Sequence, residues 1–213
     1  MNHRYWPLHR LRIRTPRLEL RLPDEALLDE LASVGAGGVH APDTMPFTVP
    51  WTDGEPDEVG RATYQHVLST IAGSTAQDWH LSLAVLHEGE VVGRQDVMGR
   101  EFGVRREVVT GSWLGLAHQG RGIGTEMRAA ALHLAFEGLG ARYAVSEART
   151  DNGGSLGVSR RLGYEPDGLQ VQVIRGAATT LQRLRLDRAG WEKHRGIDVT
   201  VEGLDACRAD FGV

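Results

Sequence analysis

The residues best suited to chemistry form a glycine-rich turn, Gln119-Gly120-Arg121-Gly122-Ile123-Gly124-Thr125. Glycine lets backbone N–H groups approach a phosphate closely, and an amphipathic helix follows whose apolar face carries Met127, Ala130, Ala131 and Leu134. Because a helix N-terminus is partially positive, the turn favours a pyrophosphate ligand, which Arg121 could screen further. The dinucleotide pattern G-x-G-x-x-G fails, since its third glycine is Thr125 or Met127 here. A turn that binds no ligand is the alternative.

The composition excludes several other classes of site. Lys193 is the only lysine among 213 residues, so no phosphate loop of the Gly-Lys-Ser/Thr type can form. Cys207 is the only cysteine, which excludes an internal disulfide, a cysteine-rich zinc site and a CxxC redox centre. A net charge of -4 gives no positive field for nucleic acid. With neither a signal peptide nor a membrane-length apolar run, we expect a cytoplasmic protein that binds no membrane and no metal.

Hydrophobic periodicity places the turn within an α/β chain. Leu18, Leu20 and Leu22 alternate with polar residues as in a strand, and Asp24 can cap a helix. Further elements are predicted in the order of a helix near 64–71, strands at 81–86, 91–98 and 107–116, a helix after 124, a strand at 143–148, a helix ending at 163, and strands at 169–174 and 180–186. We expect one domain over residues 1–213, with a core at about 14–188 and a short helix plus tail at 191–213.

A wider pattern surrounds the glycine turn. Trp113-Leu114-Gly115 precedes it, and Asn152-x-x-Ser155-x-x-Val158 and Arg161-Leu162-Gly163-Tyr164 follow it. Together with the order of the elements, this spacing resembles the GCN5-related N-acetyltransferase (GNAT) superfamily over roughly residues 14–188. Within that superfamily, Thr15-Pro16-Arg17-Leu18 and the Pro46-to-Trp51 loop look like the RimJ/RimL branch, which acetylates the N-termini of ribosomal proteins.

The resemblance implies a fold and a set of binding residues. The fold is an α/β GNAT fold, with a mixed, mostly antiparallel sheet that is splayed between its fourth and fifth strands and flanked by helices. It implies that the CoA pyrophosphate binds along the turn, at Gln119, Gly120, Arg121, Gly122, Ile123, Gly124 and Thr125. The pantetheine would pair with Leu114, Gly115 and Leu116 and would also meet Asn152, with Ser155 near the sulfur.

Acyl transfer to an amine requires a base that makes the amine neutral and a group that protonates or hydrogen-bonds the leaving thiolate. For the base we expect Glu147 first and Asp96 next, with deprotonation through water as a third route. Both carboxylates have structural alternatives, as a solvated strand residue and a turn anchor. Ser155 and Tyr164 are the candidates for the thiolate, against a helix cap and plain aromatic packing respectively.

The acceptor and acyl pocket is predicted to lie under the proline-rich loop. Phe47 and Trp51 could wall it and exclude water, or could form a hydrophobic cluster beneath the loop. A longer donor such as succinyl-CoA would need an additional cation for its carboxylate, and the sequence offers Arg94, Arg100, Arg105, Arg106 and Arg149 without choosing among them.

The sequence therefore predicts an N-acyltransferase that moves an acyl group from acetyl-CoA or another short acyl-CoA to a primary amine. The acceptor would be a protein N-terminal residue, as in the branch it resembles. The alternatives are a small-molecule amine or succinyl-CoA-dependent transferase, and a non-catalytic acyl-CoA sensor. A homodimer through the C-terminal strands is a further expectation.

Overall fold

A computed structural model describes residues 4–213, so the first three residues of the predicted domain lie outside it. Within that range the strands form one sheet in the order β7-β8-β6-β5-β4-β3-β2-β1-β9. Their bounds are β1 Arg12–Arg14, β2 Leu18–Arg21, β3 Asp78–His87, β4 Glu90–Arg100, β5 Glu107–Leu114, β6 Tyr143–Arg149, β7 Glu165–Ile174, β8 Ala177–Asp187 and β9 Thr200–Glu202. The helices are η1 Pro7–Arg10, α1 Glu25–Ala36, α2 Pro56–Gly73, α3 Phe102–Arg105, η2 Leu116–His118, α4 Ile123–His133, η3 Leu134–Gly138, α5 Gly153–Arg161, α6 Arg188–His194 and η4 Leu204–Phe211.

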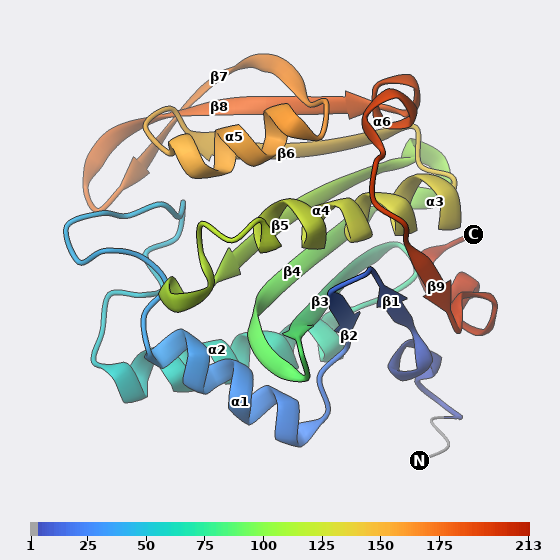
Figure 1. Cartoon of the computed structure of the whole chain (residues 1–213), viewed down its shortest axis with the longest axis horizontal. Coiled ribbons are helices and arrows are strands. Elements are labelled where there is room, and N and C mark those ends of the chain that lie inside the picture. Colours follow the sequence, from blue (N-terminus) through green and yellow to red (C-terminus); the bar gives the residue numbers. More distant parts are fainter. Residues whose placement is uncertain (1–3) are drawn as a thin grey trace.

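One pair of strands is parallel, and it positions the site. β5 and β6 pair through Glu107↔Tyr143, Val108↔Ala144 and Val109↔Val145, whereas the other neighbouring pairs in residues 4–213 are antiparallel. Beyond Val109 the ladder ends and the strands separate (Figure 1). The predicted α/β class and the mostly antiparallel, splayed sheet are confirmed. The predicted fourth and fifth strands are β5 and β6, because the short strand β1 was not predicted.

The two faces of the sheet bury alternate residues against different helices. On β3, Leu81, Leu83 and Val85 belong to the same buried cluster as Met127 and Ala131 of α4. The intervening residues Ala84 and Leu86 belong to a second cluster with Leu27, Leu28, Leu31 and Val67 of α1 and α2. Since successive strand residues point to opposite faces, α1 and α2 cover one face and α4 covers the other (Figure 1).

Local signals explain several of these elements. The Asp24 side chain accepts a hydrogen bond from the Leu27 N–H at 3.1 Å, as expected of a helix cap. Glu88 and Gly89 both have positive φ, at 54° and 87°, which suits a tight hairpin turn. That turn is two residues long rather than the predicted four, because His87 and Glu90 extend the strands and pair with each other.

The C-terminal segment is more ordered than the short helix plus tail that the sequence suggests. α6 begins at Arg188, β9 pairs with β1, and η4 buries Leu204, Cys207 and Phe211 in the main core. The short strands β1 and β9 escape prediction because three residues are too few to display a period. Burial raises the pKa of the Cys207 thiol to about 11, so it stays protonated at neutral pH. In residues 4–213, no helix combines the length and apolar character needed to span a bilayer.

Candidate active site

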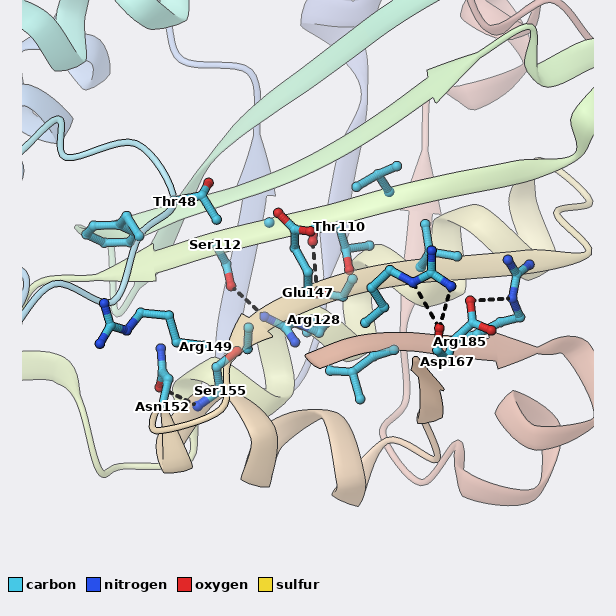
Figure 2. A pocket seen from close by; sticks show the side chains of 18 of the residues that line it. Thr48, Thr110, Ser112, Arg128, Glu147, Arg149, Asn152, Ser155, Asp167 and Arg185 are labelled. Carbon is cyan, nitrogen blue, oxygen red and sulfur yellow. Dashed lines mark hydrogen bonds and ion pairs between the residues drawn. The ribbon is translucent and has the colours of Figure 1, made fainter. Parts of the chain in front are cut away.

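The separation of β5 from β6 opens a cavity of about 590 Å³ (Figure 2). Its walls come from both strands, from the helices α4 and α5 beneath them, from β8, and from the loop that carries Phe47. The lining residues used below are Phe47, Gly111, Ser112, Arg128, Glu147, Arg149, Asn152, Ser155 and Asp167. Glu147, Asn152, Ser155 and Phe47 are thus brought to one place from segments far apart in the sequence.

One edge of β5 faces this cavity without a strand partner. The Gly115 N–H donates to the Val92 carbonyl at 3.0 Å, so peptide groups at every second residue from Gly115 point toward β4. The intervening residues Ser112 and Leu114 therefore turn their peptide groups to the open side. Thr110 shows the same direction, because its carbonyl accepts a hydrogen bond from the Ser146 hydroxyl of β6 at 3.2 Å.

Of the three residues predicted to pair with pantetheine, one faces the open side of β5 and two are bonded within the protein. Leu114 lies on the open edge, whereas the Gly115 N–H is bonded to β4 and the Leu116 N–H donates to the Gly38 carbonyl at 3.1 Å. Ser112, which the sequence interpretation did not single out, shares the open edge with Leu114. Its peptide direction follows only from the strand register, so nothing local in the sequence could have identified it.

The glycine turn forms the start of α4. Gly120 and Gly122 have φ of 72° and 80°, a region that residues with a Cβ rarely adopt. Gly122 is the N-cap, so the first turn of α4, from Ile123, directs backbone N–H groups away from the helix. The Gln119 side-chain amide donates to the carbonyls of Leu114 and Val39 at 2.9 and 2.7 Å. Gln119 therefore positions the turn through its side chain.

A buried carboxylate fastens the N-terminal segment beneath this turn. Glu126 of α4 accepts hydrogen bonds from the Thr15 hydroxyl at 2.6 Å and from Nε of Arg17 at 2.7 Å. Arg17 in turn donates to the Arg121 carbonyl at 3.3 Å. Burial alone would raise the pKa of Glu126, but the hydrogen bonds from Thr15 and Arg17 outweigh it and lower that pKa. The Thr15-Pro16-Arg17 motif thus stabilises the backbone of the turn.

Asn152 and Ser155 meet at the start of α5. The Asn152 side-chain oxygen accepts the Ser155 backbone N–H at 3.0 Å, so Asn152 caps the helix. Figure 2 shows both residues beside the open ends of β5 and β6. The cap leaves the Asn152 amide nitrogen and the Ser155 hydroxyl as the groups with which these two residues can meet a ligand in the cavity.

The two candidate bases occupy different environments. Glu147 is exposed and lines the cavity, and Figure 2 shows its carboxylate directed from β6 toward β5. Asp96 is buried on β4 and is held by Ser82 at 2.6 Å, by Arg94 at 3.0 Å and by His80 at 3.1 Å. Burial opposes ionisation of Asp96, but Arg94 and the hydrogen bonds outweigh it and lower its pKa. Gly111 lines the cavity, whereas Asp96 does not. A Cβ added to Gly111 would lie 3.9 Å from Asp96 Oδ2, so the Asp96 carboxylate lies behind the part of the wall that Gly111 forms.

Of Tyr164, Phe47 and Trp51, only Phe47 lines the cavity directly. The Tyr164 hydroxyl is buried 3.1 Å from Thr110 Oγ1, and burial raises its pKa. Phe47 lines the cavity and stacks on Trp51 with ring centroids 5.1 Å apart. Trp51 packs in turn on Trp113 of β5 at 5.5 Å. Phe47 therefore forms part of the cavity wall, and Trp51 supports it from behind. The loop thus has both features considered from the sequence, a pocket wall and a hydrophobic cluster.

Arg128, like Ser112, is a site residue that sequence reasoning missed. It is 5% exposed, lines the cavity from α4, and donates from its two terminal nitrogens to Ser159 Oγ at 2.9 Å and Ser112 Oγ at 3.1 Å. An arginine on an amphipathic helix ordinarily indicates a solvent-facing position, so its type gave no signal. Of the five arginines proposed for a longer donor, Arg149 lines the cavity and is paired with Asp151 at 2.6 Å. Arg94 is bound to Asp96.

The comparison with protein families agrees with this geometry. The profile of the acetyltransferase (GNAT) domain matches residues 17–165, which is most of the chain. The chain belongs to the GCN5-related N-acetyltransferase family. As a GNAT protein it is an acyl-CoA-dependent transferase. In residues 4–213 no group of three or more His, Cys, Asp or Glu side chains is placed to hold a metal ion.

Solved structures share the fold of this GNAT protein. RimJ of Mycobacterium smegmatis, in complex with a CoA disulfide, is 17% identical with a TM-score of 0.70, and the match covers 95% of each chain. RimL, the ribosomal L7/L12 alpha-N-protein acetyltransferase, in complex with coenzyme A, is 21% identical with a TM-score of 0.63, covering 81% of this chain and 95% of RimL. A putative acetyltransferase from T. thermophilus is 19% identical with a TM-score of 0.69, covering 92% and 95%. The RimJ/RimL-like resemblance is confirmed at the level of the fold.

Replacing Glu126 by Gln should lower the free energy of unfolding by about 1–3 kcal/mol at neutral pH, because one acceptor oxygen of a buried, hydrogen-bonded carboxylate is lost. Urea denaturation across a pH series measures the effect. Since folding lowers the pKa of Glu126, the difference from the wild type should be full above the ordinary glutamate pKa and should shrink as pH falls through the lowered value. The exposed Glu30→Gln change should alter stability by less than about 0.5 kcal/mol. A pH-independent difference for Glu126→Gln would contradict this assignment.

Proposed function

We propose that this GNAT protein transfers an acyl group from an acyl-CoA to a primary amine by direct attack of the amine on the thioester. The observation that carries the proposal is the order of three features: the glycine turn, then the open edge of β5 at Leu114 and Ser112, then the cavity that Ser112 and Glu147 line. The donor phosphates, the pantetheine and the reacting carbonyl require these three features in this order. The proposal takes residues 1–213 as one catalytic domain, against which the tail packs, and places its activity in the cytoplasm.

In this proposal the CoA pyrophosphate binds the backbone N–H groups of the turn from Gly120 to Gly124, together with the positive end of α4. The Thr125 N–H, which the sequence also suggested, donates instead to the Gly122 carbonyl at 3.1 Å. The pantetheine adds to the sheet as a short strand against Ser112 and Leu114, whose peptide groups face the gap. Asn152 meets the pantetheine arm with its amide. Gly115, Leu116 and Gln119 hold the chain in position for these contacts, because their polar groups are bonded within the protein.

The chemical step requires a proton acceptor for the attacking amine and a hydrogen-bond donor for the leaving thiolate. Glu147, as the exposed carboxylate in the cavity, removes the proton from the ammonium group, directly or through water. Ser155 is placed at the cavity wall to hydrogen-bond the leaving thiolate. Tyr164 reaches the cavity only through Thr110, and Asp96 is occupied by three partners, so both are second candidates for these roles.

The acceptor meets Glu147 as the carboxylate available to it in the cavity. Glu107 and Asp167 also line the cavity, but both are paired with Arg185, at 2.9 and 3.1 Å. An ammonium group is attracted by a carboxylate such as Glu147. An N-terminal residue of a protein is the acceptor we favour, since RimL, which shares the fold, acts on the N-terminus of ribosomal L7/L12. A small-molecule amine is the second candidate. A non-catalytic sensor would keep the turn and Asn152 but would not need Glu147.

Changing Gly122 to Asp should abolish the binding of CoA, because a Cβ and a negative charge are placed at a positive-φ N-cap facing the pyrophosphate. Isothermal titration calorimetry with free CoA measures this. Gly89→Asp is the matched control, since Gly89 also has a positive φ, of 87°, but lies in the distant β3–β4 turn. Unchanged CoA affinity in a folded Gly122→Asp protein would refute the phosphate site.

Changing Glu147 to Gln should lower kcat/KM for a peptide acceptor by about a hundredfold or more, because the base is lost. Thiol release from acyl-CoA reports the rate, and CoA affinity should be retained. Glu165→Gln removes an exposed carboxylate from β7, and this change should leave the rate unchanged. A Glu147→Gln rate equal to that of the wild type would exclude Glu147 as the base. Absence of thiol release from the wild type with N-terminal peptides, polyamines and aminoglycosides would favour the sensor.

The expected homodimer is supported by the edge strand β7. It ends the sheet and exposes Leu169, Val171 and Val173 by 65%, 66% and 76% on one side. An unpaired apolar edge is a template for another strand, and a second copy of β7 would satisfy it with two-fold symmetry.

Val171→Asp should therefore shift the protein from twice 23.3 kDa to 23.3 kDa in sedimentation equilibrium, because a charge at the centre of this edge opposes pairing. Val104→Asp is the control, since Val104 is also exposed, at 85%, but lies on α3. A monomeric wild type, or a dimer that persists in Val171→Asp, would contradict this arrangement.

A further inference from the structure

A buried positive charge without a carboxylate partner lies in the wall of the cavity. Arg128 is 5% exposed, and none of the carboxylates in residues 4–213 forms an ion pair with it. Its two terminal nitrogens donate to the hydroxyls of Ser112 and Ser159, and its Nε is buried with no hydrogen-bond partner. Hydroxyl groups are neutral, so they do not compensate the charge of the guanidinium. Folding an uncompensated buried cation is unfavourable unless something else completes its environment.

Burial together with the lack of an ion pair distinguishes Arg128 from the other arginines that line the cavity. Arg149 pairs with Asp151, and Arg185 pairs with Glu107 and Asp167. Arg183 is exposed to solvent and donates to the Asp167 carbonyl. Burial lowers the pKa of Arg128, and the one ionisable group that opposes this shift is Tyr164, whose own pKa is raised by burial so that its phenol is neutral at physiological pH. The guanidinium of Arg128 is thus buried in the cavity wall, and no carboxylate of residues 4–213 is paired with it.

The position of Arg128 in the cavity is fixed by its two hydrogen bonds. They connect Ser112, on the open edge of β5, to Ser159 of α5, so the guanidinium forms part of the floor of the wedge-shaped gap between β5 and β6. Figure 2 shows its guanidinium between β5 and β6, with Asn152 and Ser155 on the side where the strands stand apart. A pantetheine that runs past Asn152 and Ser155 toward the closed end of the wedge therefore directs its acyl group at Arg128.

The geometry points to an acyl donor that carries a terminal carboxylate, a short dicarboxylic monothioester of CoA such as succinyl-CoA, bound through Arg128. The inference rests on the proposed function and names its donor. The carboxylate would accept hydrogen bonds from the guanidinium and the neighbouring hydroxyls and would neutralise the buried charge. An acetyl methyl group could do neither, and would leave Nε of Arg128 without a partner.

The chemical step is unchanged by this donor. The amine nitrogen forms a bond to the thioester carbonyl carbon, the carbon–sulfur bond breaks, the ammonium proton passes to the base, and the thiolate takes up a proton. The distal carboxylate is retained in the product, which is an N-acyl amine with a new negative charge. The product therefore differs from an acetylated amine in charge as well as in size.

Calorimetry on the wild-type chain with free CoA, acetyl-CoA and succinyl-CoA provides the first test. We expect succinyl-CoA to bind about tenfold to a hundredfold more tightly than acetyl-CoA, the range for hydrogen bonds to a charged group. Equal or weaker binding of succinyl-CoA overturns the inference, and would fit an Arg128 that contacts the thioester carbonyl common to both donors. Failure of free CoA to bind overturns the proposed function instead, so the two failures are distinguishable.

Arg128→Met provides the second test, because methionine fills similar space without charge. This variant should bind succinyl-CoA and acetyl-CoA with equal affinity while keeping the affinity for free CoA. Arg149→Gln is the matched control, since Arg149 lines the same cavity but is paired with Asp151, and its preference for succinyl-CoA should persist. A preference that survives in Arg128→Met, or is lost in Arg149→Gln alone, overturns the assignment. If Arg128→Met does not unfold cooperatively, Arg128→Lys replaces it, and the wild-type ratio of affinities decides the question.

Discussion

The separation of β5 from β6 is the constraint on which the site depends. Each strand follows its antiparallel neighbour, since β5 stays paired with β4 as far as Leu114 and β6 stays paired with β8 as far as Arg149. Between them only three residue pairs are made before the two halves of the sheet diverge. The divergence leaves peptide groups of β5 without a strand partner. Because buried peptide groups need hydrogen-bond partners, the gap is a site for an extended, amide-containing ligand.

The charges around the gap are arranged in two different ways. Beneath the glycine turn, Glu126 is enclosed by donors from Thr15 and Arg17, so its negative charge is satisfied within the protein. Beside Ser112, where the strands have already separated, the hydrogen bonds of the Arg128 guanidinium go to hydroxyl groups. The first arrangement stabilises the backbone of the glycine turn. The second leaves a buried positive charge in the cavity wall with no ion pair among residues 4–213.

Local sequence patterns were reliable where local physics determines the structure. The Asp24 cap and the hairpin between β3 and β4 each depend on residues within a few positions of one another, although the hairpin turn is two residues long rather than the predicted four. The C-terminal segment was underestimated because its order comes from distant contacts. Phe211 packs on Trp79 with ring centroids 4.9 Å apart, and β9 is held by β1 at the other end of the chain.

The sequence by itself determined the glycine turn before a helix, the cap at Asp24 and the family, because each is encoded by residue types at fixed spacing along the chain. It also offered Glu147 and Asp96 as candidate bases. Only the tertiary structure decided that Asp96 is enclosed by three partners while Glu147 faces the cavity. It also decided that Arg128, one of many arginines, is buried and unpaired. Burial and ion pairing depend on which distant segments pack together, and residue spacing along the chain carries no information about that packing.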